Sequence, residues 1–135
     1  MAPIKRLLFV DDEDNIRLTL PRILEKYGFE VTAVANVAEA LAEMDHNKYD
    51  VLISDLNIEK PGDGFSIIAA MHTRQPKCAN VILTGYPDFE SALQAIRLSV
   101  ADYFVKPVDI EALISAIKKE RVRKVRKAVR SAKVH

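Results

Sequence analysis

Short apolar segments alternate with longer amphipathic segments along the chain. The apolar segments occupy residues 6–11, 30–35, 51–55, 80–84 and 102–106. The first and third are almost continuously apolar up to an aspartate, which is typical of strands buried on both faces of a parallel sheet. Because helix-like segments separate all five, the pattern predicts an α/β fold with a five-stranded parallel sheet covered by helices on both faces.

The intervening segments have the apolar period of amphipathic helices. They predict helices at 14–27, 37–47, 64–74 and 88–98, and a fifth that begins at 108–109. Pro21 lies inside the first helix, where it removes one backbone hydrogen bond and predicts a kink. Gly28 is typical of the end of that helix, and Asn36 of the N-cap of the second.

Length and composition indicate one globular domain. Of the 135 residues, 49% are hydrophobic and 29% charged, which is ordinary for such a domain. No apolar run approaches the ~20 residues of a membrane-spanning helix, so we expect no membrane contact. The one cysteine, Cys78, permits no internal disulfide and favours a cytoplasmic location.

The net charge of +1 hides an uneven distribution. Residues 118–135 hold nine Lys or Arg and one Glu, whereas the rest of the chain holds eleven Lys or Arg and eighteen Asp or Glu. We therefore divide the chain into a domain at 1–120 and a basic helical tail or linker at 121–135. The tail has three interpretations: a solvated terminus, a coiled-coil or linker helix, or a contact with nucleic acid or an acidic partner. No DNA-binding helix pair is recognisable within these 135 residues, which argues against sequence-specific DNA recognition by this stretch.

Polar side chains gather where the predicted strands end. Asp11 and Asp12 follow the first strand, Asp55 ends the third, Thr84 the fourth and Lys106 the fifth. Ligands of open α/β sheets bind at the carboxyl ends of the strands, so we expect these side chains to share one edge. Three carboxylates there require a counter-charge, and a set of oxygen ligands suits Mg²⁺.

Asp55 is the candidate nucleophile of this edge. It lies between the acidic pair on one side and Thr84 and Lys106 on the other. A carboxylate can accept a phosphoryl group as an acyl phosphate. A lysine and a hydroxyl supply the charge and the hydrogen bond that such a group requires. The residues therefore predict phosphoryl transfer to Asp55.

These residues, together with Tyr103 and the Lys106–Pro107 pair, resemble the receiver domain of two-component response regulators. The resemblance spans residues 5 to about 120 and rests on several positions that match in order. It implies a flavodoxin-like, doubly wound (βα)₅ fold. It also implies that a histidine kinase or phosphotransfer protein phosphorylates Asp55, so that the protein is a signalling switch rather than an enzyme.

The resemblance further implies roles for single residues. Lys106 would form an ion pair with the phosphoryl group and precede a cis peptide bond, and Thr84 would donate a hydrogen bond to a phosphoryl oxygen. Tyr103 would be the aromatic switch that turns inward when Thr84 moves. The Mg²⁺ ligands would be Asp11, Asp12, Asp55 and the backbone carbonyl of Asn57.

The resemblance also implies how the switch is read. The face formed by the fourth helix, the fifth strand and the fifth helix would carry the signal. Its readers would be an output domain, a separate effector protein or a second copy of the chain in a homodimer.

The loop after Asp55 departs from the family pattern. The family usually has a proline four residues and a glycine eight residues after the acceptor, whereas Pro61 and Gly64 lie six and nine residues after Asp55. We expect a loop one residue longer, with an altered rim that affects kinase docking or the lifetime of the acyl phosphate.

Three other interpretations remain open at this point. Asp12 or Asp14 would serve only as an N-cap of the first helix. A haloacid-dehalogenase-like phosphatase would also use an aspartyl phosphate and Mg²⁺, but it needs a second Asp where this chain has Asn57, and its nucleophile lies on the first strand. A receiver-like module would bind partners without phosphorylation.

Overall fold

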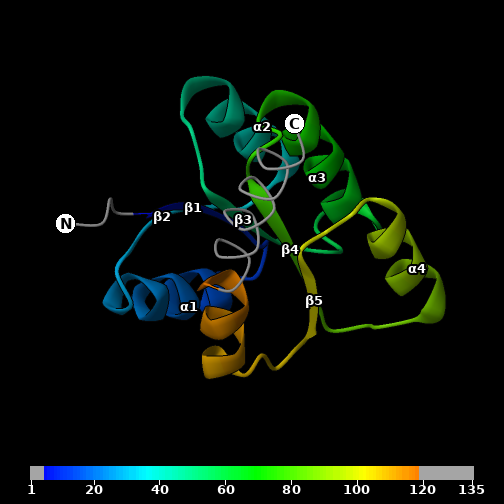
Figure 1. Ribbon diagram of the computed structural model, residues 1–135. Coiled ribbons are helices and arrows are strands. Elements are labelled where there is room, and N and C mark those ends of the chain that lie inside the picture. The colour runs from blue at the N-terminus through cyan, green and yellow to red at the C-terminus, as the bar shows by residue number, and fades with distance from the viewer. Residues whose placement is uncertain (1–4, 119–135) are drawn as a thin grey trace, which may run out of the picture.

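The computed structural model describes residues 5–118, and it contains a five-stranded parallel sheet with helices on both faces (Figure 1). The strands are β1 (Lys5–Val10), β2 (Phe29–Val34), β3 (Val51–Asp55), β4 (Ala79–Thr84) and β5 (Asp102–Val105). The helices are α1 (Asp14–Lys26), α2 (Val37–His46), α3 (Asp63–Arg74) and α4 (Phe89–Arg97), followed by a helical segment at 110–118. The predicted elements are confirmed, with small shifts at their ends. The predicted tail at 121–135 lies outside the described residues.

The strand order is β2-β1-β3-β4-β5, and every neighbouring pair is parallel. This is the doubly wound, flavodoxin-like order. The order reverses between β1 and β3, because the chain first adds β2 on one side of β1 and then continues on the other. The ends of β1 and β3 therefore flank the switch point of the sheet.

Alternate residues of the central strands enter two separate cores. Leu8 and Val10 of β1 pack in the cluster that contains residues of α2 and α3. Leu7 and Phe9 of the same strand pack with residues of α1 and of segment 110–118. Figure 1 shows these two pairs of helices on opposite faces of the sheet. Helices thus cover both faces of the sheet, and this explains why β1 and β3 are apolar along almost their whole length.

The helix ends agree in part with the sequence. Asn36 caps α2 by accepting a hydrogen bond from the Glu39 backbone N–H, as predicted, and α1 continues through the buried Pro21 to Lys26. The capping interpretation of Asp12 and Asp14 is wrong. Glu13 occupies the N-cap position of α1 and makes no side-chain cap hydrogen bond, while Asp14 is already helical.

Candidate functional site

The carboxyl ends of four strands bring the predicted polar residues to one edge of the sheet. Asp11 directly follows β1, while Asp55 and Thr84 are the last residues of β3 and β4. The backbone N–H of Lys106, just after β5, donates to the Thr84 carbonyl at 2.8 Å. Since the strands are parallel and β3 lies between β1 and β4, Asp55 occupies the middle of this edge.

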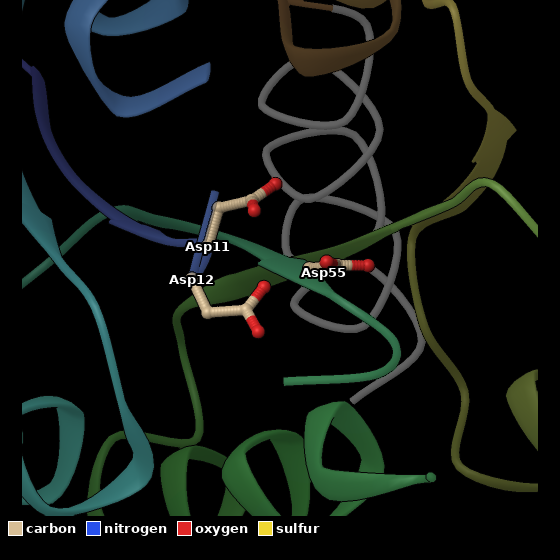
Figure 2. Close-up of side chains that lie close together, drawn as sticks. All are labelled: Asp11, Asp12 and Asp55. Carbon is tan, nitrogen blue, oxygen red and sulfur yellow. The ribbon is translucent and has the colours of Figure 1, made fainter. Parts of the chain in front are cut away.

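Three carboxylates converge there (Figure 2). One oxygen each of Asp11, Asp12 and Asp55 lies within 4.8 Å of the others. Asp11 and Asp55 are buried, whereas Asp12 is exposed. Such a set of hard oxygen donors, with one open side, fits a divalent cation that keeps several waters.

Lys106 is the counter-charge for the two buried carboxylates. Its Nζ lies 2.9 Å from Asp11 Oδ2 and 3.2 Å from Asp55 Oδ2, and 3.4 Å from Glu13 Oε1 at the rim. Burial lowers the pKa of Lys106, but the hydrogen bond and the attraction to Asp11, together with Asp55, outweigh it and raise that pKa. The lysine is therefore held as a cation inside the acidic edge.

The same surroundings act on Asp55 in the opposite direction. Burial and repulsion from Asp11 raise the pKa of Asp55 to about 6, although Lys106 and the Asn57 backbone N–H both favour the charged form. One lysine thus compensates two carboxylates incompletely. A further cation at this edge would complete the compensation.

Thr84 and Tyr103 lie on neighbouring strands. The buried Thr84 hydroxyl accepts a hydrogen bond from the Tyr86 backbone N–H at 3.0 Å. The Tyr103 hydroxyl lies 2.8 Å from Ser91 Oγ on α4, and Ser91 Oγ also donates to the Asp88 carbonyl at 3.1 Å. Tyr103 is therefore connected to the first turn of α4, and no hydrogen bond joins it to Thr84 among the described residues.

The loop after Asp55 is folded tightly onto the end of β3. Asn57 Oδ1 accepts from the Gly62 N–H at 3.0 Å, and Asp63 Oδ2 accepts from the Glu59 and Lys60 N–H groups. Gly64 lies so close that a Cβ there would be 2.4 Å from the Asp55 carbonyl oxygen. The chain turns into α3 at Gly62, where φ is 82°, and the extra loop residue expected from the family pattern stays a prediction.

Three residues near this edge were not singled out from the sequence. Arg17 donates from Nη1 to the Asp11 backbone carbonyl at 2.7 Å and forms an ion pair with Asp14. Glu13 contacts Lys106, and Ser91 contacts Tyr103. The spacing of Asp14 and Arg17 by three helical positions was a usable signal, whereas the Glu13 and Ser91 contacts depend on tertiary packing.

The comparison with protein families shows the class of the chain. The model of the response regulator receiver domain matches residues 7–118. The chain belongs to the receiver domain family. The receiver domain is similar to the acid tolerance regulatory protein ActR of Rhizobium meliloti, with 32% identity over 117 residues, which cover 87% of this chain and 60% of ActR. It is also similar to the regulatory protein AtoC of Escherichia coli, with 32% identity over 84% of this chain and 24% of AtoC.

Solved structures show the same fold. A receiver domain protein from Methanospirillum hungatei superposes with a TM-score of 0.85 at 25% identity, covering 93% of this chain and 99% of that one. A response regulator from Burkholderia pseudomallei, solved with a phosphorylated aspartic acid and a calcium ion, gives a TM-score of 0.77 at 28% identity. That match covers 91% of this chain and 74% of the other.

These relatives define the class of this receiver domain. It is a two-component signalling domain whose similar proteins are response regulators rather than classical enzymes. The chain spans about 60% of the length of ActR. Within residues 5–118, no helix is long and apolar enough to span a membrane. The cytoplasmic location expected from the single cysteine stays a prediction.

Proposed function

We propose that this receiver domain is a phosphoacceptor switch in which Asp55 takes a phosphoryl group from a histidine kinase or phosphotransfer protein. The observation that carries the proposal is the position of Asp55, whose carboxylate lies within reach of both the acidic pair and Lys106 Nζ. The phosphorylated aspartic acid in the Burkholderia pseudomallei relative supports the same chemistry here. Family membership favours this role over the phosphatase alternative.

The chemistry is a displacement at phosphorus. A carboxylate oxygen of Asp55 forms a new bond to phosphorus while the bond to the donor nitrogen breaks, and the donor imidazole leaves. Asp55 must be ionised to attack, which its pKa of about 6 permits at neutral pH. Lys106 would form an ion pair with the phosphoryl oxygens, and the Thr84 hydroxyl would donate to one of them.

Mg²⁺ is the proposed cofactor. Its ligands would be Asp11, Asp12, Asp55 and the backbone carbonyl of Asn57. When bound, it would neutralise charge on the phosphoryl oxygens. The 4.8 Å cluster of carboxylate oxygens supports this role, as does the calcium ion in the Burkholderia pseudomallei relative.

The phosphodonor would dock beside Lys106. A hollow of about 240 Å³ lies there between α1 and the segment after β5, and apolar side chains such as Ile16, Leu20 and Val108 line it. An apolar hollow beside Lys106 supports a protein rather than a small molecule as the physiological donor.

The output would be read at α4, β5 and the segment at 110–118. Phe89 and Ile96 of α4 are 77% and 74% exposed, and Val105 of β5 is 48% exposed. Phe89 and Ile96 are seven positions apart and share one stripe of the helix. This apolar surface supports a protein reader, which would be an output domain, an effector or a second copy of the chain.

Labelling of the acceptor tests the proposal. The wild-type chain should take up one phosphoryl group from acetyl phosphate with Mg²⁺, as measured by intact mass, and Asp55→Asn should take up none. Asp45→Asn on α2, where Asp45 pairs with the exposed Arg74, is the matched control and should label like the wild type. Stoichiometric labelling of Asp55→Asn would refute the assignment.

A further inference from the structure

Asp12 differs from the other two carboxylates of the cluster in its hydrogen bonds and ion pairs. The Asp11 carboxylate accepts hydrogen bonds from the Glu13 N–H and from Lys106 Nζ, both at 2.9 Å, and Asp55 contacts the same Nζ. In residues 5–118, the exposed Asp12 carboxylate has no hydrogen bond or ion pair. The direction of Asp12 toward its two neighbours therefore depends on the backbone that carries it.

Arg17 clamps that backbone. Its Nη1 donates to the carbonyl of Asp11, which belongs to the peptide group that leads into Asp12, at 2.7 Å. Its Nη2 pairs with the Asp14 carboxylate, and its backbone N–H donates to the Glu13 carbonyl at 3.1 Å. The guanidinium thus bonds to both ends of the turn 11–14 with a planar, pre-organised fork. The side chain is only 22% exposed.

We propose that Arg17 is a positioning residue for the metal site, acting through the Asp11 carbonyl to aim Asp12 at Asp11 and Asp55. The inference rests on the proposed role of these three carboxylates in binding a divalent cation. Rotation of the peptide between Asp11 and Asp12 breaks the Arg17 bond, so the bond restricts the Asp12 carboxylate to orientations that close the cluster. Metal-ligand orientation of this kind contributes strongly to metal affinity.

A purely electrostatic role predicts the opposite sign. The guanidinium is a positive charge beside the cluster, and its removal by itself would strengthen the binding of a cation. A positioning role predicts weaker binding after removal. The sign of the change in Mg²⁺ affinity therefore separates the two effects, with no phosphoryl donor present.

The experiment is a calorimetric titration of the 135-residue chain with Mg²⁺ alone at fixed ionic strength. Arg17→Met should weaken Mg²⁺ binding roughly tenfold, the lower range for loss of a residue that orients a ligand. Arg17→Lys keeps the charge but offers one ammonium in place of the fork, and it should also weaken binding. Arg22→Met removes an exposed charge from the same helix and should leave the affinity unchanged.

The melting temperature without Mg²⁺ is measured for each variant, and Arg17→Lys decides the outcome if Arg17→Met does not fold. Unchanged or tighter Mg²⁺ binding by the Arg17 variants would overturn the proposal, as would equal weakening by Arg22→Met. If the wild type binds no Mg²⁺ in the millimolar range, both the Arg17 proposal and the proposed metal role of the three carboxylates are refuted. Labelling of Asp55 is a separate measurement, so failure of the Arg17 proposal and failure of the phosphoacceptor proposal are distinguishable.

Discussion

At the scale of single residues, the acidic run after β1 is divided among different tasks. Asp11 is buried and bonded to Lys106, Asp12 is exposed at the open side of the cluster, and Glu13 reaches Lys106 from the rim. Asp14 pairs with Arg17. The consecutive acids are tolerated because two basic side chains, from α1 and from the end of β5, contact three of the four, and Asp12 is exposed to solvent.

The raised pKa of Asp55 predicts how stability depends on pH. The pKa is about 6 in the folded chain and near 3.8 when the chain is unfolded, so the folded state binds this proton more tightly. The ionised Asp55 therefore costs stability, and the cost appears as pH rises from about 4 to about 6 and is full above that. Asp55→Asn should be more stable than the wild type at pH 8 without Mg²⁺, and this gain should shrink toward pH 4.

Urea denaturation at pH 8 and pH 4.5 measures this difference. Asp45→Asn is again the control, because Asp45 is half-exposed on α2. A wild type that is more stable than Asp55→Asn at pH 8 would contradict the conclusion that Asp55 is under-compensated.

At the scale of elements, the loop between β3 and α3 depends on a close backbone approach. A Cβ on Gly64 would lie 2.4 Å from the Asp55 carbonyl oxygen and 2.8 Å from Leu56 Cα. Both are backbone atoms, so they cannot move away without distorting the loop. We expect Gly64→Ala to lower the free energy of unfolding by about 3 kcal/mol, the upper part of the range for overpacking.

Gly85 provides the matched control for this substitution. A Cβ at Gly85 meets nothing within 4 Å, so Gly85→Ala should change the free energy of unfolding by less than about 1 kcal/mol. Chemical denaturation of both variants is the measurement. Equal stability of the two would mean that the β3–α3 loop is not held as tightly as its geometry indicates.

The link between β5 and α4 is a second prediction at this scale. The Tyr103 and Ser91 hydroxyls lie 2.8 Å apart, so removing either should lose the same bond. Ser91→Ala and Tyr103→Phe should each cost about 1 kcal/mol, and the double variant should cost clearly less than their sum. Thermal or urea unfolding of the four proteins gives the coupling energy. Strict additivity would show that the two hydroxyls act independently.

At the scale of the whole molecule, the acidic edge couples metal binding to folding. Asp11 and Asp55 share one lysine in the folded chain, and Asp12 has no basic partner among residues 5–118. A cation that binds the folded cluster more tightly than the unfolded chain must stabilise the fold.

Millimolar Mg²⁺ should therefore raise the melting temperature of the wild type at pH 8 and have a smaller effect on Asp12→Asn. Differential scanning calorimetry with Mg²⁺ and with an equal ionic strength of NaCl measures the specific effect. A wild type that is more stable without Mg²⁺ would contradict the view that this edge needs a second cation.

Much of this protein follows from local sequence. The five strands, the helices between them and the Asn36 cap are confirmed, because apolar period and capping depend on neighbours along the chain. The convergence of Asp11, Asp55, Thr84 and Lys106 was predictable as well, since parallel strands place their carboxyl ends at one edge. Their individual roles in phosphoryl transfer stay predictions.

Tertiary structure decided which side chains that are distant in the sequence contact one another. Arg17 reaching the Asp11 carbonyl, Glu13 reaching Lys106 and Tyr103 bonding to Ser91 all depend on side-chain directions that no pattern along the chain specifies. The pKa of Asp55 likewise depends on burial and on a lysine 51 positions away, which exist only once the sheet is assembled. Sequence by itself determined which residues meet at the edge, and packing decided how their charges are balanced, because electrostatic interactions depend on distance and burial rather than on order in the chain.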